Sequence, residues 1–100
     1  MRKIVLMCSN GMSTSLLVSK MKDYAETIGY NCAISAYSIT ELDNIKGDAD
    51  IILLGPQIRF KLQDVKNSVT IPVQVIDMAA YGMMDGKAVI SSVREQLGDV

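Results

Sequence analysis

The chain of 100 residues is long enough for one compact domain with its own hydrophobic core, and too short for a second core. Ten lysines and arginines against eleven acidic residues give a net charge of −1, and the scattered basic residues argue against a nucleic-acid-binding surface. Histidine is absent, which removes the commonest metal ligand and the commonest general base near neutral pH. We therefore expect neither a metal site nor a cofactor.

Two cysteines in a chain without a signal peptide are typical of a reduced, cytoplasmic protein. The longest uninterrupted apolar run, Ile4–Cys8, is far shorter than the roughly 20 residues that a membrane-spanning helix needs. We expect a soluble domain with no direct membrane insertion, so that any contact with a membrane is made through a partner.

Short runs rich in β-branched residues or leucine indicate four strands, and segments with helical spacing of apolar residues separate them. The strand runs are Ile4–Cys8, Asn31–Tyr37, Ile51–Leu54 and Val73–Ile76. The expected helices begin near Ser13–Ser15, at Ile39, at Ile58 and at Lys87, and they end at Gly29, Gly47, Pro72 and Leu97.

Strand–helix alternation repeated four times predicts a parallel sheet, because parallel strands need crossover connections and helices supply them. We therefore predict an α/β fold of three layers, α/β/α, with a four-stranded parallel sheet and one domain over residues 1–100. Ligand sites in such folds lie beyond the carboxyl ends of the strands. This rule points to the loops at 8–15, around 37–40, at 55–57 and at 77–82.

The loop after the first strand carries the clearest chemical signal. Cys8 ends the strand run, a small polar loop containing Gly11 follows, and a helix is expected to begin near Ser13 or Thr14. The N-terminus of a helix offers partial positive charge and free N–H groups, which stabilise a thiolate and bind anions. Gly11 allows successive N–H groups to face inward as an anion nest. The pattern predicts Cys8 as a nucleophile in a phosphate-binding loop made of Ser9, Asn10, Gly11, Met12, Ser13, Thr14 and Ser15.

A purely structural interpretation of the same loop makes Cys8 a small buried hydrophobic residue and Ser13 a helix cap. Cys32 lies inside the second strand run, and we expect it to be structural. The two cysteines do not form a C-x-x-C pair, and the glycine motifs of nucleotide-binding loops are missing from the sequence. Dithiol redox chemistry and nucleotide binding are therefore not supported.

Three residues are predicted to contact a partner: Met12, Gln57 and Tyr81. Gln57 belongs to a Gly-Pro-Gln segment after the third strand, at the edge where Cys8 lies. This segment either forms a second wall of the site or is only a strand-to-helix turn.

Asp77, at the end of the fourth strand, corresponds in place to a phosphatase general acid, but a cap for the turn Met78–Tyr81 is the favoured interpretation. Met78, Met83 and Met84 could join Met12 in an apolar rim around the cysteine. Core filling is the commoner role of methionine, and only Met12 has a loop context that favours exposure.

The order Cys8, five residues, then Thr14-Ser15 resembles the C-x5-R-[ST] loop of the low-molecular-weight protein tyrosine phosphatases. Those enzymes have arginine where this chain has Thr14, and that arginine clamps the phosphoryl oxygens during transfer. A loop without the arginine can hold a phosphoryl group but should hydrolyse phosphocysteine poorly. The departure favours a phosphoryl carrier.

The whole chain resembles the IIB component of the bacterial phosphoenolpyruvate-dependent sugar phosphotransferase system, in its lactose/cellobiose (chitobiose) family. The main matching segment runs from Cys8 to Met21, and shorter matches follow at 53–58, 75–77, 81–82 and 85–86. The resemblance implies that Cys8 accepts a phosphoryl group from a phosphohistidine of a IIA protein. It implies transfer from there to a β-glucoside or disaccharide of the cellobiose, chitobiose or lactose type, which a membrane IIC permease holds and translocates.

On this resemblance the chain is a protein-phosphocysteine–sugar phosphotransferase, cytoplasmic and transiently at the inner face of the membrane through IIC. Two alternatives remain open: a phosphatase-like or arsenate-reductase-like enzyme, and an anion-binding domain in which Cys8 is never modified. A hydrolase turns over an aryl phosphate alone, whereas a carrier needs a donor protein. The sequence does not identify the sugar, the oligomeric state or the cognate IIA and IIC proteins.

Overall fold

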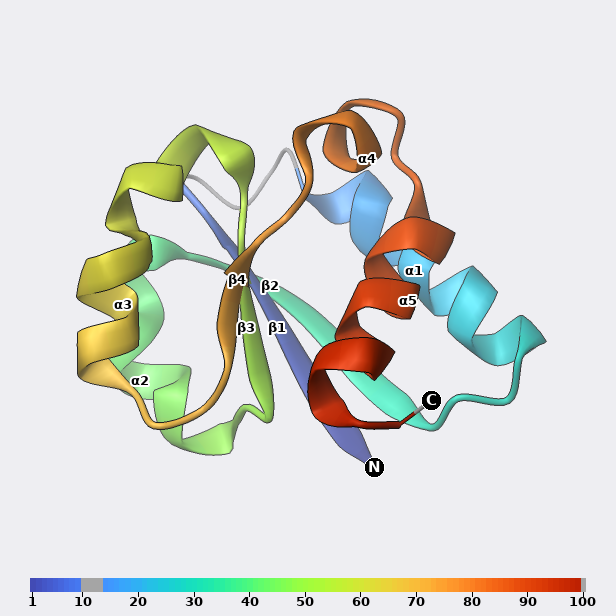
Figure 1. Cartoon of the computed structure of the whole chain (residues 1–100), viewed down its shortest axis with the longest axis horizontal. Helices are drawn as coiled ribbons and strands as arrows, with labels where there is room; N and C mark the ends of the chain where they lie inside the picture. The colour runs from blue at the N-terminus through green and yellow to red at the C-terminus, as the bar shows by residue number, and fades with distance from the viewer. Residues whose placement is uncertain (10–13, 100) are drawn as a thin grey trace.

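Strands and helices alternate along the chain in the computed structural model, which describes residues 1–9 and 14–99. All strand pairs are parallel, and the strand order is β2-β1-β3-β4 (Figure 1). The strands are β1 (Arg2–Cys8), β2 (Cys32–Ser38), β3 (Ile51–Leu54) and β4 (Val73–Val75). The predicted four-stranded parallel sheet is thus confirmed, with strand ends that differ from the sequence runs by one or two residues.

Five α-helices and three short 3-10 helices connect and follow these strands within the described residues. The α-helices are α1 (Ser15–Thr27), α2 (Leu42–Ile45), α3 (Leu62–Ser68), α4 (Met78–Gly82) and α5 (Gly86–Leu97). The 3-10 helices are η1 (Ile39–Glu41), η2 (Lys46–Asp48) and η3 (Pro56–Lys61).

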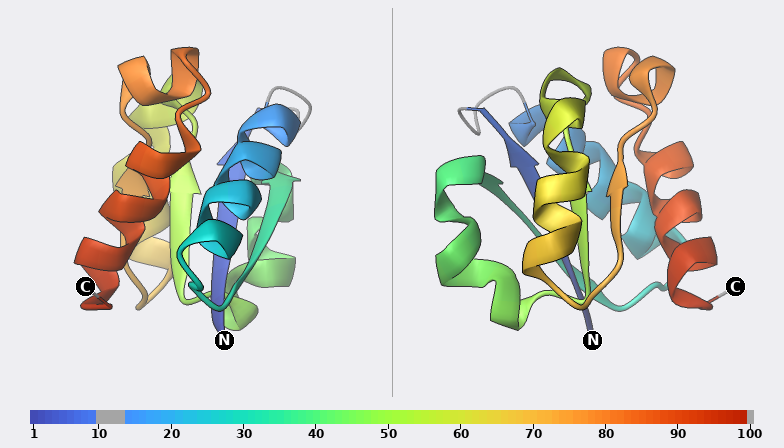
Figure 2. Two further views of the ribbon diagram at one scale, coloured as in Figure 1. Left: turned by 90° about the vertical axis from the view of Figure 1, so that its right-hand side faces the viewer. Right: turned by 60° about the vertical axis from the view of Figure 1, so that its left-hand side comes forward.

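The sheet separates two hydrophobic clusters, one on each face, so that the molecule has the predicted three layers (Figures 1 and 2). Side chains alternate between the two faces along a strand, and β1 shows this clearly. Ile4 and Leu6 pack toward α1 and α5, whereas Val5 and Met7 pack toward α2, η3 and α3. The buried part of β1, Ile4–Cys8, is therefore entirely apolar, as is typical of a parallel strand covered on both faces.

Three helical segments differ from the sequence prediction. The helix expected from Ile39 to Gly47 is α-helical only over Leu42–Ile45, with the 3-10 helices η1 and η2 on either side. The helix expected to start at Ile58 is a 3-10 helix as far as Lys61, because Ile58 itself has non-helical angles of φ −117° and ψ 25°, and α-helix begins only at Leu62. The predicted turn Met78–Tyr81 forms most of the helix α4 instead. Five residues are too few to show a helical repeat of apolar positions, which explains why the sequence pattern missed this helix.

Helices α1 and α5 lie side by side on one face and approach closely at Gly86 (Figure 2). A Cβ atom at this glycine would lie 2.4 Å from the backbone carbonyl carbon of Lys20 in α1. Only glycine permits this contact between backbones. Among the described residues, none of the helices has the length and apolar character required to cross a membrane.

Candidate functional site

Cys8 is the last residue of β1, and the pleat of the strand directs it to the same face as Ile4 and Leu6, where α1 packs. It pairs in register with Ser38, the last residue of β2. The Cys8 side chain is only 1% exposed. A thiol thus lies just beneath the surface at the carboxyl edge of the sheet, where ligand sites of such folds are found.

Thr14 brings a hydroxyl close to this thiol. Its Oγ1 atom lies 3.9 Å from Cys8 Sγ, within the range of a hydrogen bond to sulfur, and either atom can donate. The side chain is fully buried and makes no capping bond to the helix, although Thr14 is the residue before α1 and its carbonyl accepts a hydrogen bond from Val18 N–H at 2.9 Å. The hydroxyl is therefore directed to the sulfur rather than to the helix end.

The rest of the predicted phosphate loop is described only at its two ends. Ser9 is exposed, and its carbonyl accepts a hydrogen bond from Ser38 Oγ at 3.4 Å. Ser15 is exposed and is the first residue of α1. Asn10, Gly11, Met12 and Ser13 lie outside the described residues, so the anion nest and the contact by Met12 stay predictions.

Ser38 was not singled out from the sequence, although the rule of carboxyl strand ends did point to the loop around it. Its hydroxyl also lies 3.0 Å from Thr40 Oγ1 and accepts a bond from Thr40 N–H at 3.4 Å, which caps η1. This serine joins the end of β2 to the residue after Cys8. A serine between Tyr37 and Ile39 carries no pattern that distinguishes such a role.

Gly55 and Gln57 form the other wall beside Cys8. Gly55 N–H donates to Met7 O at 2.8 Å, which holds the end of β3 against the end of β1. A Cβ atom at Gly55 would lie 3.6 Å from Cys8 Cβ and 2.8 Å from Gln57 Oε1. The carboxamide of Gln57 and the Cys8 side chain therefore both border the space that glycine leaves empty.

Gln57 and Tyr81, both predicted as partner contacts, line one hollow of about 580 Å³ between η3 and α4. The hydrophobic ring of Phe60 also lines it, and Arg59 brings a positive charge to it. The full lining is Pro56, Gln57, Arg59, Phe60, Met78, Tyr81 and Gly82, which we call the η3–α4 hollow. The structure thus brings the two predicted contact residues together from segments that are 24 positions apart in the sequence.

Asp77 caps α4, because its Oδ2 atom accepts a hydrogen bond from Ala80 N–H at 3.1 Å. The capping interpretation is thereby confirmed. The expected core position of Met78 and Met83 is wrong, since these side chains are 61% and 77% exposed, whereas Met84 is half-buried and packs against the core. The short helix α4 buries Ala80 and Tyr81 and leaves its first residue, Met78, and the residue after it, Met83, exposed.

Cys32 lies in β2, half-buried, as its place in the strand run predicted. Burial raises the pKa of its thiol, which lowers the fraction of reactive thiolate. No group of three or more His, Cys, Asp or Glu residues with the geometry to hold a metal ion occurs in the part of the chain that the structure describes.

Residues 3–92 match the family described as "PTS system, Lactose/Cellobiose specific IIB subunit". The chain belongs to this family. The match includes β1, Cys8, the whole of α1 and the η3–α4 hollow, so the candidate site lies within it.

Individual relatives agree with this assignment. The chain is 50% identical over 90 residues to the oligo-beta-mannoside-specific EIIB component of Bacillus subtilis, with 87% of each chain covered. It is 41% identical over 97 residues to a galactose-specific EIIB component of Lactococcus lactis, with 89% of this chain and 90% of the relative covered. The solution structure of a cellobiose-specific phosphotransferase IIB component from Borrelia burgdorferi is similar, with a TM-score of 0.82 and 33% identity over 98% of this chain and 93% of that one.

Proposed function

We propose that the protein is a phosphoryl carrier in which Cys8 forms a phosphocysteine. The Cys8 sulfur attacks the phosphorus of a phosphohistidine on a IIA protein; the S–P bond forms, the N–P bond breaks, and the imidazole takes up the proton that the thiol loses. In the second transfer a sugar hydroxyl attacks the phosphorus, the S–P bond breaks, and the hydroxyl proton returns to the thiolate. The chain then acts as a protein-phosphocysteine–sugar phosphotransferase.

The single observation that carries this proposal is the contact between Cys8 Sγ and Thr14 Oγ1, in a chain of this family. Thr14 stands where a phosphatase loop of this type has arginine, and residues 9–15 contain no positive charge. A neutral hydroxyl supports a bound phosphoryl group by hydrogen bonding, but it supplies none of the charge that speeds hydrolysis. The chemistry of the site therefore favours a carrier over a hydrolase.

Exposed apolar side chains around the same edge support docking of proteins. Leu16, Phe60, Met78 and Met83 follow the carboxyl ends of β1, β3 and β4, and each is more than half exposed. Exposed apolar groups that gather at one end of a small domain are typical of a protein–protein contact surface. We propose that a IIA protein and a membrane IIC permease use this surface in turn, with the sugar held by the permease.

The sugar itself stays open within a class. The three relatives named above are described as specific for oligo-beta-mannoside, galactose and cellobiose. We propose a β-glycoside or disaccharide of the cellobiose, chitobiose or lactose type.

The test is the intact mass of the protein after incubation with phosphoenolpyruvate, the general phosphotransferase proteins and a lactose/cellobiose-family IIA protein. The wild type should gain the mass of one phosphoryl group. Cys8→Ser should gain none, and Cys32→Ser, the matched thiol control, should gain as much as the wild type. Phosphorylation of Cys8→Ser at the wild-type level would contradict the proposal.

The phosphatase-like alternative makes the opposite prediction for the isolated protein. A transfer site that loses charge stabilisation comparable to that of the phosphatase arginine typically loses roughly two or more orders of magnitude in rate. We therefore expect no measurable turnover of para-nitrophenyl phosphate by the protein alone. Steady turnover that disappears in Cys8→Ser would favour the hydrolase.

A further inference from the structure

The space at Gly55 brings a side chain close to Cys8 that no loop motif includes. Gly55 is buried after the end of β3, and its missing Cβ leaves room that both Gln57 Oε1 and Cys8 Cβ border. Gln57 Oε1 lies 2.8 Å, and Cys8 Cβ 3.6 Å, from the ideal position of a Cβ atom at Gly55. These two atoms are therefore separated by no more than the sum of the two distances. The carboxamide is thus within reach of a group attached to the Cys8 sulfur.

The turn that carries Gln57 is fixed by its neighbours. Gly55 N–H donates to Met7 O, and Ile58 N–H donates to Gly55 O at 3.0 Å. The side chain of Ile58, a residue of η3, is buried. Pro56 removes a rotatable φ between these anchors. The backbone of Gln57 is therefore held at a constant place beside the site, while its exposed side chain keeps rotational freedom at its end.

We propose that Gln57 is a further phosphoryl-binding residue, whose Nε2 donates a hydrogen bond to a phosphoryl oxygen on Cys8; this inference rests on the proposed function. A phosphoryl group brings about −1.5 to −2 charges and three strong acceptor oxygens. A carboxamide offers two N–H donors, and half a turn about its last torsion exchanges its oxygen for its nitrogen. Gln57 binds the phosphoryl group from the β3 side, opposite Thr14.

The choice of a neutral donor fits a carrier. An arginine at this place would add a full positive charge and favour attack by water, whereas a carboxamide holds the phosphoryl oxygens without that charge. The group then stays bound until a partner docks over the η3–α4 hollow, which Gln57 also lines.

Two variants remove the contact in different ways. Gln57→Leu keeps the approximate volume of an exposed side chain and removes its donors. Gly55→Ala keeps Gln57 but fills the space, because the new methyl group would meet Gln57 Oε1 at 2.8 Å and Cys8 Cβ at an ordinary 3.6 Å. The backbone angles of Gly55, φ −60° and ψ 149°, suit alanine, so this variant should fold.

Each variant has a matched control on the same protein. Gln63→Leu removes an exposed glutamine whose carboxamide donates to Asn67 Oδ1, away from the site. Gly47→Ala adds a methyl group at a glycine where a Cβ atom would meet nothing within 4 Å. Amide NMR spectra verify that all four variants keep the fold.

The readouts are the phosphorylated fraction at equilibrium with phosphorylated IIA protein and the side-chain NH₂ resonances. A hydrogen bond to a charged group predicts about a tenfold lower ratio of phosphorylated to free protein for Gln57→Leu and Gly55→Ala, with both controls unchanged. In the wild type, the Gln57 NH₂ resonances should shift on phosphorylation, and those of Gln63 should not.

The outcomes separate the inference from the proposed function. If the wild type is phosphorylated on Cys8 but the Gln57 NH₂ resonances stay in place, or both variants reach the wild-type ratio, the inference is wrong and the carrier proposal stands. If the wild type gains no phosphoryl group at all, the proposed function is wrong and the inference with it.

Discussion

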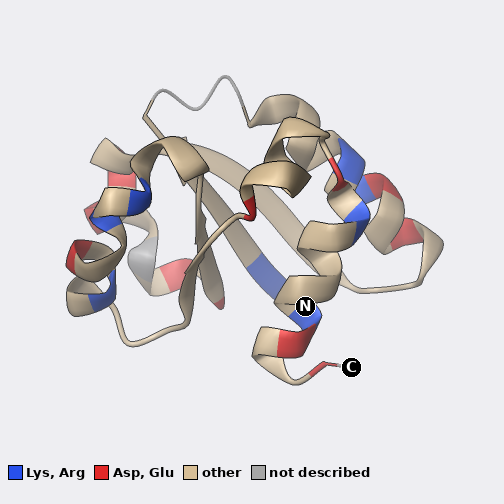
Figure 3. Ribbon diagram, turned by 45° about the horizontal axis from the view of Figure 1, so that its top comes forward, with Lys and Arg blue, Asp and Glu red and all other residues tan. Residues whose placement is uncertain are grey.

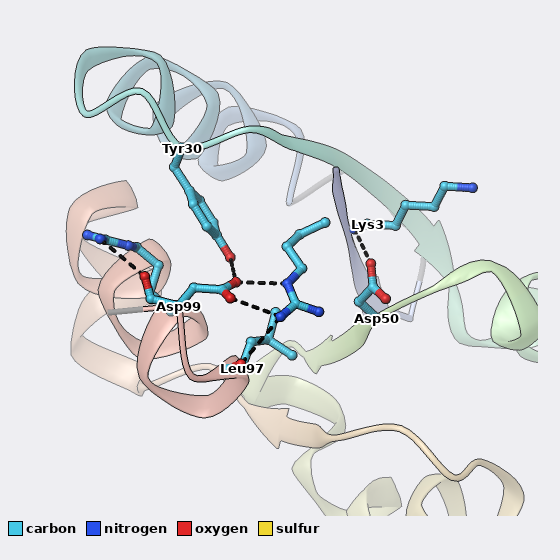
Figure 4. A network of polar contacts seen from close by, with 7 residues as sticks. Lys3, Tyr30, Asp50, Leu97 and Asp99 are labelled. Atoms are coloured by element: carbon cyan, nitrogen blue, oxygen red, sulfur yellow. Dashed lines mark hydrogen bonds and ion pairs between the residues drawn. The ribbon is translucent and has the colours of Figure 1, made fainter.

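At the amino ends of the strands, Arg2 and Tyr30 donate hydrogen bonds to Asp99, whereas the carboxyl ends carry the Cys8 thiol and the Thr14 hydroxyl. Arg2 donates to both Asp99 oxygens, at 2.8 Å from Nε and 2.9 Å from Nη2, and Tyr30 OH donates to Oδ2 at 2.6 Å (Figure 4). Arg94 stacks over the Tyr30 ring, 5.5 Å from its centre. We call Arg2, Tyr30, Arg94 and Asp99 the amino-edge cluster.

The carboxyl edge is built from different chemistry. Cys8 contacts Thr14, and exposed apolar side chains surround the η3–α4 hollow. In Figure 3 the charged positions lie mainly along the helices that flank the sheet. An edge where Arg2 and Tyr30 bond to Asp99 stabilises the end of α5, and an edge with exposed apolar groups leaves room for a partner. Substitutions at the two edges should therefore separate stability from function.

The largest effect on stability is expected at neither edge but in α5, which runs from one to the other. Gly86→Ala would drive a methyl group to 2.4 Å from the backbone of Lys20, which no side-chain rotation relieves. Helix α5 must then move away from α1, and buried residues such as Ile90 lose contacts. We expect a loss of about 3 kcal/mol in the free energy of unfolding, measured by urea denaturation.

Gly82→Ala is the control for this prediction, since a Cβ there meets nothing within 4 Å. It should change the free energy of unfolding by less than about 0.5 kcal/mol. Equal stability of the two variants would show that the helices adjust freely.

Thr14→Val tests the carboxyl edge by removing one hydroxyl and keeping the shape of the side chain. The rate of phosphoryl acceptance from IIA protein should fall about tenfold, because the phosphoryl group loses a hydrogen-bond donor. Stability should change by less than about 1 kcal/mol, since valine keeps the shape of the side chain and a hydrogen bond between a hydroxyl and a thiol at 3.9 Å is weak. An unchanged rate, measured in a rapid-quench assay, would remove Thr14 from the site.

Asp99→Asn tests the amino edge and should have the smallest effect. The hydrogen bonds from Arg2 and Tyr30 lower the pKa of Asp99 from 3.8 to about 2. A carboxylate whose pKa is lower in the folded protein than in the unfolded chain stabilises the fold at pH values above its unfolded pKa. This contribution is lost as the pH falls from about 4 to about 2. Because the pair is partly exposed and screened by salt, we expect the melting temperature at pH 7 to fall by only a few degrees.

The difference between the wild type and Asp99→Asn should accordingly shrink below pH 4 and disappear near pH 2, in thermal melts at low ionic strength. Phosphoryl acceptance by this variant at pH 7 should equal that of the wild type. A tenfold loss of acceptance would mean that the two edges are coupled, which contradicts the comparison above.

The sequence pattern was sufficient for the sheet and for the position of Cys8 at the end of β1, because continuous apolar runs mark buried parallel strands and a strand end fixes which face its last residue meets. It was insufficient for α4, because the segment Met78–Tyr81 was interpreted as a turn. It also missed the exposure of Met78 and Met83, since whether a methionine is buried depends on which side of a short helix packs. The proximity of Gln57 to Cys8 depends on the absent Cβ of Gly55, a three-dimensional relation that spacing along the chain does not contain.

The central claim is that the phosphoryl group resides on Cys8, and peptide mapping of the phosphorylated protein tests it most directly. After incubation with phosphoenolpyruvate, the general proteins and a IIA protein, the thiols are alkylated under mild conditions in denaturant and the protein is digested. The account predicts a phosphoryl group on the peptide containing Cys8, with that cysteine protected from alkylation and Cys32 fully alkylated. A phosphoryl group on any other peptide, or equal alkylation of both cysteines in protein that carries a phosphoryl group, would contradict it.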